Sequence, residues 1–436
     1  MTAVPPGTER DGGTAARGPL RLHTWSDPAV VAVAFAALAG GMGQFGAVAA
    51  LGDVARAFGQ VSHGATVADQ AGLSGTVLGV GLAVIRLASL GGLPVAGMAD
   101  RFGRRRILLI TLATGLTLTA LAAASPGYWW FVAIFACGRP LLSGADAVIQ
   151  VTAAEHTGKD DRAKAIALAA AGYGVGAGFI AVLHGLASGV LGFRGLMAVA
   201  LLPVGGLLWL RRRLEEPDRF TVSMSNLDRP VPILGAVGLP YRRRLGIVTG
   251  LAFAISVITG PANGFVFLYA DNILHQPGYA TAAMVVGAGA SGLVGLILGQ
   301  MLADRVGRRW TGSLAMIGIA LCGLLAYSGS TGELDAGYII GVGVGSILAP
   351  AAGAMLNELF PTSVRASVAG WWIAAGVAGA ATGLVLFGAV SDVGGRFGAA
   401  AAVTFLPAAA AAGLFWLLPE TRGLEPEQLE GGGRSA

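Results

Sequence analysis

Three ionisable residues lie inside long apolar segments of this chain, where a charge is costly unless it has a function or a partner. Arg86 stands near the middle of segment 70–96, and Arg139 and Asp146 both stand in segment 129–154. Their seven-residue spacing places Arg139 and Asp146 on one face of a helix, about 10 Å apart. Two chemistries follow from these residue types. Guanidinium groups can bind an anion, and a carboxylate can take up and release a proton for coupling.

The same three residues could instead form a buried ion network that only fixes helix packing, and the sequence leaves both interpretations open. Gln44, Tyr173, Asn263 and Trp372 are candidate uncharged lining residues from four other apolar segments, although packing alone also accounts for each. His184 lies near the outer end of its segment, and we interpret it as an interfacial residue and not as a proton carrier.

The composition predicts a membrane bundle as the fold that positions these residues. Of 436 residues, 54% are hydrophobic and 12% are charged, whereas soluble domains carry about 25% charged residues. Apolar segments near the roughly 20 residues that span a bilayer recur along the whole chain. They lie at 28–51, 70–96, 107–125, 129–154, 164–188, 195–210, 245–270, 280–303, 311–328, 336–357, 366–391 and 398–418.

Basic residues are distributed unevenly between the predicted loops. With the amino terminus inside, the inner segments carry 24 of the 29 Lys and Arg residues. Because inner loops of membrane proteins are enriched in Lys and Arg, we predict a multi-pass plasma-membrane protein with both termini in the cytoplasm. This asymmetry also explains the net charge of +5, so no nucleic-acid partner is expected.

A pattern of charges recurs in the two halves at a spacing of 203 or 204 residues. Residues 100–105 read DRFGRR and residues 304–309 read DRVGRR, and two further acidic positions recur at the same spacing. The repeat predicts two six-helix bundles, and charge contacts that form in one state and break in another would make a gate. The alternative is that these charges only mark the inner surface.

The predicted gate residues are the charged and glycine residues of these motifs. They are Asp100, Arg101, Gly103, Arg104, Arg105, Glu155, Arg162, Asp304, Arg305, Gly307, Arg308, Arg309, Glu358, Arg365, Glu420 and Arg422. The predicted domains are a disordered cytoplasmic tail (1–27), an amino-terminal bundle (28–210), a cytoplasmic linker (211–244), a carboxy-terminal bundle (245–418) and a second cytoplasmic tail (419–436).

With these motifs the chain resembles the major facilitator superfamily over roughly residues 28–430. DRxGRR resembles the family signature between the second and third helices. Residues 357–366, NELFPTSVRA, resemble the element E-x-x-P-x-x-x-R-G, and residues 419–423, PETRG, resemble the ending PETKG of sugar porters and metabolite–proton symporters. Gly138 and Arg139 resemble the pair that opens the motif of the fourth helix.

The resemblance implies an all-α membrane protein with twelve helices in two pseudo-symmetric bundles that work by alternating access. It implies proton-coupled symport of a small organic solute, for which an organic anion is one candidate. The alternative within transport is proton-driven efflux of an apolar or cationic compound. Segment 255–263 lacks the glutamine pair that sugar porters use for hexose hydroxyls, which argues against a hexose.

Other classes of function are less compatible with the sequence. A membrane receptor would need an output domain, and the inner loop 211–244 is too short and too basic for one. We found neither H-E-x-x-H nor G-x-S-x-G, so we expect no enzyme, no metal and no cofactor. The expected partners are the solute, protons and the lipid bilayer, and the expected state is a monomer.

Overall fold

The structure, a computed structural model, describes residues 28–64, 66–155, 162–213, 235, 237–393 and 396–422. The predicted tail at 1–27, most of the predicted linker at 211–244 and the end of the predicted tail at 419–436 lie outside the described residues.

The amino-terminal bundle is built from helices that run between the two ends of the molecule. They are α1 (Pro28–Ala49), α4 (Gly75–Ala88) continued by η2 (Ser89–Gly91) and α5 (Gly92–Phe102), α6 (Arg104–Leu121) with η3 (Ala122–Ala124), α7 (Tyr128–Glu155), α8 (Arg162–Ala198), and η4 (Val199–Leu201) with α9 (Leu202–Arg213). Two short helices, α2 (Leu51–Phe58) and α3 (Val67–Ala71), join the first span to the second.

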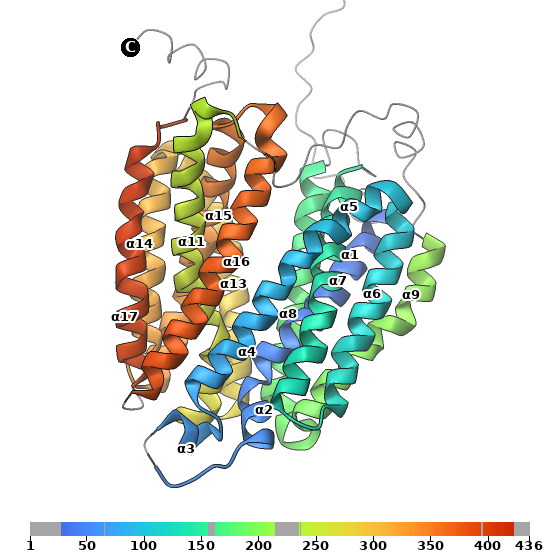
Figure 1. The fold of residues 1–436 in the computed structure, drawn as a ribbon, viewed down its shortest axis with the longest axis vertical. Helices are drawn as coiled ribbons and strands as arrows, with labels where there is room; N and C mark the ends of the chain where they lie inside the picture. The colour runs from blue at the N-terminus through green and yellow to red at the C-terminus, as the bar shows by residue number, and fades with distance from the viewer. Residues whose placement is uncertain are drawn as a thin grey trace, which may run out of the picture.

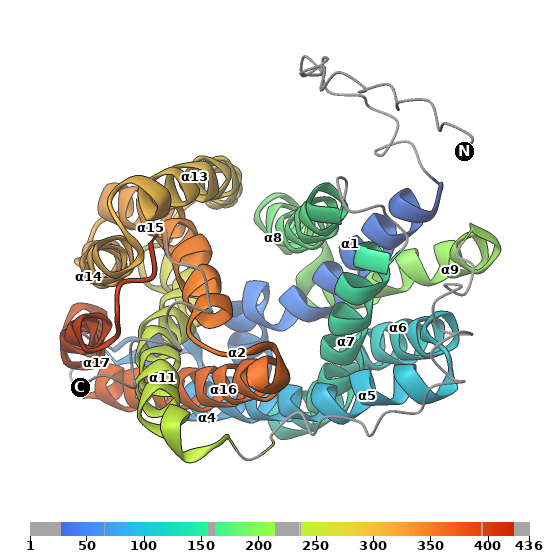
Figure 2. The same ribbon diagram turned by 90° about the horizontal axis from the view of Figure 1, so that it is seen from above.

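The carboxy-terminal bundle repeats this plan. Its helices are η5 (Leu239–Tyr241) with α11 (Arg242–Gly264), α12 (Val266–Leu268) and η6 (Tyr269–Ile273), then α13 (Gly278–Arg305), α14 (Arg308–Ala326), α15 (Thr331–Glu358), α16 (Thr362–Asp392), and α17 (Phe397–Ala410) with η7 (Ala411–Leu417). Figures 1 and 2 show the two bundles side by side, and α4 and α8 pack against α16 and α13 of the other bundle.

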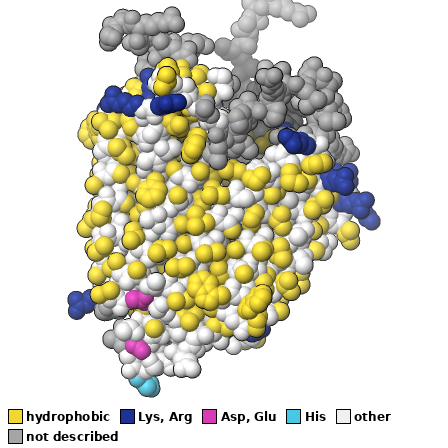
Figure 3. Space-filling view, viewed as in Figure 1, with side chains coloured by type: hydrophobic (Ala, Val, Ile, Leu, Met, Phe, Trp, Pro, Cys, Tyr) yellow, Lys and Arg dark blue, Asp and Glu magenta, His cyan; other side chains and the backbone are white. Residues whose placement is uncertain are grey.

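Eleven helical stretches among the described residues are long and apolar enough to cross a membrane, and one of them, Lys164–Arg213, is 50 residues long. Only about 20 residues are needed for one crossing, so this stretch supplies two spans. Figure 3 shows a broad apolar face with Lys and Arg mainly at one end. The predicted fold class, twelve membrane helices in two bundles, is confirmed.

The structure corrects two predicted boundaries. The predicted gap between spans 164–188 and 195–210 is helical, and the chain turns there at Gly192, where φ is 56°. The span predicted to begin at residue 70 begins at Gly75, because Gly72, with φ 93°, ends α3 and the Ser74 side chain caps the next helix by accepting from the Val77 N–H. Hydropathy alone does not register such caps.

Glycines allow the same close helix contact in each bundle. In the amino-terminal bundle, a Cβ added to Gly176 of α8 would lie 2.0 Å from the Leu38 carbonyl oxygen of α1. In the carboxy-terminal bundle, a Cβ added to Gly379 of α16 would lie 2.1 Å from the Phe253 carbonyl oxygen of α11. Membrane helices associate through such close backbone packing, so the equivalent contacts support the internal repeat.

The repeated DRxGRR motif has the same backbone in both copies. Gly103 has φ 95° and Gly307 has φ 112°, and each separates two helices at the arginine-bearing end of its bundle. We call this end of the molecule the arginine-rich end and the other end the opposite end. The arginine-rich end contains residues 101–106, 211–213, 242–244 and 305–309. A positive φ strongly favours glycine, which explains why the motif holds glycine at this position twice.

We expect Gly307→Ala to lower the free energy of unfolding by about 1–3 kcal/mol, because a side chain at this φ is strained. The added Cβ would also lie 2.7 Å from Glu420 Oε2. The apparent melting temperature of the purified protein in detergent measures the effect. Gly332→Ala is the control, since Gly332 lies in the first turn of α15 with nothing within 4 Å of an added Cβ. Equal melting temperatures for the two variants would contradict the argument.

Candidate functional site

Gln44 of α1 joins the two charged residues of α7. Its side-chain Nε2 donates to Asp146 Oδ2 at 2.5 Å, and its backbone carbonyl accepts from Arg139 Nη1 at 3.2 Å. Gln44 is 5% exposed and Arg139 is 8% exposed. Gln44 therefore provides one hydrogen-bond partner for the Asp146 carboxylate and one for the Arg139 guanidinium, at a depth where few water molecules are available.

The sequence of α1 makes room for this contact. Gly40 lies one turn before Gln44 on the same face, and a Cβ on Gly40 would lie 2.8 Å from Asp146 Oδ1. The carboxylate of Asp146 therefore lies directly against the backbone of α1. Any larger residue at position 40 would push it away.

Arg86 belongs to the same group, although it comes from α4. Its charge interacts with that of Arg139 and with the Tyr173 side chain of α8. Arg86 is exposed, whereas Arg139 is buried and its Nε has no hydrogen-bond partner. Two guanidinium groups that repel each other, with one carboxylate held by Gln44, leave an excess of positive charge that an anion can compensate.

The two candidate residues of the other bundle lie apart from this group. Asn263 of α11 is exposed, and its Nδ2 donates to the Thr259 carbonyl of its own helix at 2.8 Å. Trp372 of α16 is half-buried against the apolar core. No hydrogen bond or ion pair between described residues joins either to the Arg86–Asp146 group, so their lining role stays a prediction.

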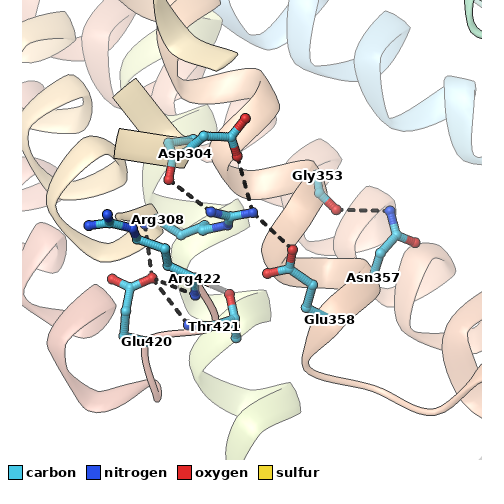
Figure 4. Close-up of polar contacts among 9 residues, drawn as sticks. Asp304, Arg308, Gly353, Asn357, Glu358, Glu420, Thr421 and Arg422 are labelled. Carbon is cyan, nitrogen blue, oxygen red and sulfur yellow. Dashed lines mark hydrogen bonds and ion pairs between the residues drawn. The ribbon is translucent and has the colours of Figure 1, made fainter. Parts of the chain in front are cut away.

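Four predicted gate residues of the carboxy-terminal bundle, Asp304, Arg308, Glu358 and Glu420, form one network (Figure 4). Arg308 Nη2 lies 3.1 Å from Glu358 Oε1 and 3.3 Å from Asp304 Oδ1. The Glu420 carboxylate accepts from the backbone N–H of Arg308 at 3.0 Å and of Arg309 at 3.2 Å. Glu420 therefore caps α14, where the helix dipole favours an anion, and the network joins α13, α14, α15 and the chain after α17 within one bundle.

Further members of the predicted gate bond to backbone carbonyls. Arg309 Nη2 donates to Trp416 at 2.6 Å and Arg365 Nη2 donates to Asn357 at 2.8 Å. Arg105 Nη2 of the first DRxGRR copy donates to Arg211, near the end of α9. Since Arg105 corresponds to Arg309 in the repeat, the last arginine of the motif makes the same kind of contact in both bundles.

The remaining gate residues contribute less to the observed network. Arg101 and Arg305 are exposed, Arg104 is half-buried, and Arg422 donates its backbone N–H to Glu420 at 3.2 Å. The side chains of Asp100, Glu155 and Arg162 lie outside the described part of the structure. The gate role of these motifs therefore stays a prediction in both bundles.

The structure reveals polar contacts at the opposite end that sequence reasoning missed. Asp392, at the end of α16, accepts from the backbone N–H of Gly75 at 2.6 Å and of Thr76 at 2.9 Å. The Thr76 hydroxyl donates to the same carboxylate at 2.6 Å. This contact joins the two bundles. Its signal in the sequence is weak, because a cap formed by a residue more than 300 positions away has no local pattern.

His184 corrects a sequence prediction. It is only 3% exposed, so it is not an interfacial residue. Its Nε2 lies 3.0 Å from Asp53 Oδ2 of α2 and its Nδ1 lies 3.7 Å from Asp271 Oδ2 of η6. Its place near the end of a span suggested the lipid interface, but α2 and η6 cover it.

Comparisons with known proteins agree with this geometry. A family model described as Major Facilitator Superfamily matches residues 33–334 and 284–435. The chain belongs to the Major Facilitator Superfamily. Its family and the relatives named below are transporters, and the chain is a multi-pass membrane transporter.

Three relatives illustrate the similarity. A Cupriavidus pinatubonensis protein named as a probable 4-methylmuconolactone transporter is 25% identical over 376 residues, covering 82% of this chain and 85% of the relative. The sialic acid transporter NanX of Escherichia coli is 26% identical over 285 residues, covering 63% and 68%. The inward-open structure of the E. coli xylose transporter XylE has a TM-score of 0.68 at 18% identity, covering 92% and 99%.

We expect Glu358→Gln to slow maximal transport by roughly tenfold while changing substrate binding less than about twofold, because charge-assisted contacts such as that with Arg308 contribute about 1.5–3 kcal/mol. Initial uptake rates and equilibrium binding by purified protein check this. Glu333→Gln is the matched control, since it lies on the same helix at its other end. Equal loss of rate and binding at unchanged protein abundance would show that the network does not act as a gate.

Proposed function

We propose that this transporter moves a small organic acid across the plasma membrane by proton-coupled alternating access. The observation that carries the proposal is the group of Arg139, Gln44 and Asp146, joined by hydrogen bonds, with the charge of Arg86 near enough to act on Arg139. This arrangement favours an anionic group over a cation. A site for a cationic drug would present the opposite balance of charge.

The names of the relatives support an acid as the substrate class. One of them transports sialic acid, and another is named for a lactone of the muconate type. Similarity to the xylose transporter supports the fold only, since the identity is 18%. The absence of the glutamine pair in segment 255–263 also argues against a hexose.

The contacts between the bundles support alternating access. A Cβ on Gly388 of α16 would lie 2.2 Å from the Gly75 carbonyl oxygen of α4, and one on Gly278 of α13 would lie 1.8 Å from the Gly185 carbonyl oxygen of α8. Together with the contact of Asp392, these close backbone approaches support an interpretation in which the two bundles are closed against each other at the opposite end. Arg86, farther along α4, is exposed. We therefore interpret the structure as a state open towards the arginine-rich end.

Orientation follows from the same distribution of charge. Because cytoplasmic ends of membrane proteins carry the excess of Lys and Arg, we propose that the arginine-rich end and both termini are cytoplasmic. The state in the structure is then open to the inside. We further propose that the chain functions as a monomer in the lipid bilayer, since the residues proposed to bind the substrate and the proton, Arg86, Arg139 and Asp146, all come from one chain.

Asp146 is the proposed coupling residue. Its carboxylate lies within a span, against the backbone at Gly40 and bonded to Gln44 of α1. Movement of α1 relative to α7 would change this bond and the access of water. A carboxylate whose surroundings change between states takes up a proton in one state and releases it in the other.

We expect Arg86→Gln to weaken binding of a carboxylate substrate by about tenfold or more, and of its neutral amide analogue by less than about twofold, because a charge-assisted contact contributes about 1.5–3 kcal/mol. Competition binding of the acid and amide forms of each candidate compound measures the difference. Arg396→Gln, at the opposite end of the molecule, is the control for a general loss of charge. Transport of neutral or cationic compounds alone would refute the assignment of substrate class.

We expect Asp146→Asn to abolish accumulation driven by an imposed proton gradient while substrate exchange at equal concentrations persists, because Asn keeps the hydrogen bond with Gln44 but cannot carry a proton. Proteoliposome uptake with and without the gradient measures both reactions. Asp335→Asn, in the first turns of α15, is the control. If Asp146→Asn still concentrates substrate with inward proton flow, another group carries the proton.

A further inference from the structure

A second titratable cluster lies at the opposite end, away from Asp146. It consists of Asp53 and Arg56 of α2, His184 of α8 and Asp271 of η6. The imidazole lies between the two carboxylates, 3.0 Å from Asp53 and 3.7 Å from Asp271. Asp53 and His184 belong to the amino-terminal bundle and Asp271 to the other, so the imidazole bridges the bundles.

The two ring nitrogens are in different situations. Nε2 is within hydrogen-bond distance of Asp53, whereas Nδ1 is buried without a hydrogen-bond partner and faces the Asp271 carboxylate. The Thr281 hydroxyl of α13 donates to the other oxygen of Asp271 at 3.3 Å, which holds this carboxylate in place. A neutral imidazole has one N–H and can serve only one carboxylate. An imidazolium has two, and satisfies both.

The charged groups around His184 have a negative excess, which a positive charge on the imidazole would compensate. Arg56 Nη2 lies 3.1 Å from Asp53 Oδ1, and its side chain is 45% exposed, so solvent screens its charge. The described contacts of α13 with the cluster come from the uncharged Thr281. Two carboxylates facing one screened arginine leave a negative excess that an imidazolium compensates.

Asp53 remains ionised over the range in which histidine titrates. Burial alone would raise the pKa of Asp53, but the hydrogen bond and charge of His184, together with Arg56, lower it below the ordinary value for aspartate. A carboxyl with a lowered pKa stabilises the folded contact at and above its ordinary pKa, and this stabilisation is lost only as the pH falls through the lowered pKa. Asp53 therefore faces the imidazole as an anion throughout the range of about pH 5 to 8 in which histidine side chains ordinarily change their charge.

We propose that His184 is a proton-binding site that closes the opposite end of the molecule. A proton taken from water at that end, while the end is open, gives both ring nitrogens an N–H. The imidazolium then draws Asp53 and Asp271 together as α8 closes against α13 at Gly185 and Gly278. Loss of the proton leaves Asp271 facing a lone pair and favours reopening. The idea rests on the alternating access proposed above, but it needs no substrate.

The test is the distance between the bundles as a function of pH, measured without substrate. Spin labels at Val190 of α8 and at Val393 after α16 report this distance, since these residues are 92% and 79% exposed and belong to different bundles. Cys137 and Cys322 are replaced by serine, and the full-length chain is reconstituted in lipid nanodiscs. We expect the ratio of closed to open populations to fall about tenfold between about pH 5.5 and about pH 8, because one proton is linked to closure.

Three variants separate His184 from other titrating groups. His184→Gln should make the ratio independent of pH. Asp271→Asn should do the same while keeping His184, because an amide N–H can donate to the neutral ring nitrogen. His63→Gln is the matched control, an exposed histidine at the same end, and should keep the response of the parent.

The outcomes are decisive in either direction. A parent protein whose distance does not respond to pH, or a His184→Gln variant that responds as the parent does, overturns the proposal. If His184→Gln fails to fold, the response of Asp271→Asn decides. A pH response that persists while no organic acid is transported leaves this site in place and overturns only the proposed substrate.

Discussion

Inside a bilayer a charge must find its partner within the protein, and this constraint governs where the chain places its few ionisable side chains. Gln44 is a partner for both Arg139 and Asp146. Its backbone carbonyl accepts a hydrogen bond from Arg139, and its side-chain amide donates one to Asp146. The contact requires α1 and α7 to lie close together, which in turn requires glycine at position 40. Arg86 then remains as the exposed charge of the group, which is why we propose it as the contact for an anionic ligand.

Close backbone packing is the second consequence of the membrane, where the hydrophobic effect does not drive helices together. The pairs α1–α8 and α11–α16 use glycine in equivalent ways, at Gly176 and Gly379. Between the bundles, Gly75–Gly388 and Gly185–Gly278 bring backbones equally close. Large side chains also meet between the bundles, since the Phe45 ring of α1 and the Phe267 ring of α12 pack edge to face with centroids 5.9 Å apart. One buried apolar cluster contains residues of both bundles, among them Leu78 and Phe265, and a second lies within the amino-terminal bundle.

The sequence predicted the spans and the internal repeat because both depend on local signals, namely apolar length and recurring charged motifs. The repeated motif pointed to Gly103 and Gly307 as functionally important. The reason for glycine at these positions, a positive φ, became visible only in the fold. The sequence placed Arg86, Arg139 and Asp146 inside spans but not Gln44 between them, since pairing across 102 residues has no local signature. His184 was interpreted wrongly for the same reason. Its burial comes from α2 and η6, whose positions no sequence pattern specifies.

The two ends of the molecule use charge differently, and this difference is what alternation requires. At the arginine-rich end, Arg308 and Glu420 bond within the carboxy-terminal bundle in this state, so these contacts do not hold the two bundles together there. At the opposite end, Asp392 and Asp271 face groups of the other bundle, so these contacts must break for that end to open. Carboxylates and backbone N–H groups released there exchange protein partners for water, so each broken charge-assisted bond costs only about 1.5–3 kcal/mol net. Two states of such a molecule can therefore lie within a few kcal/mol of each other, close enough for a substrate or a proton to select between them.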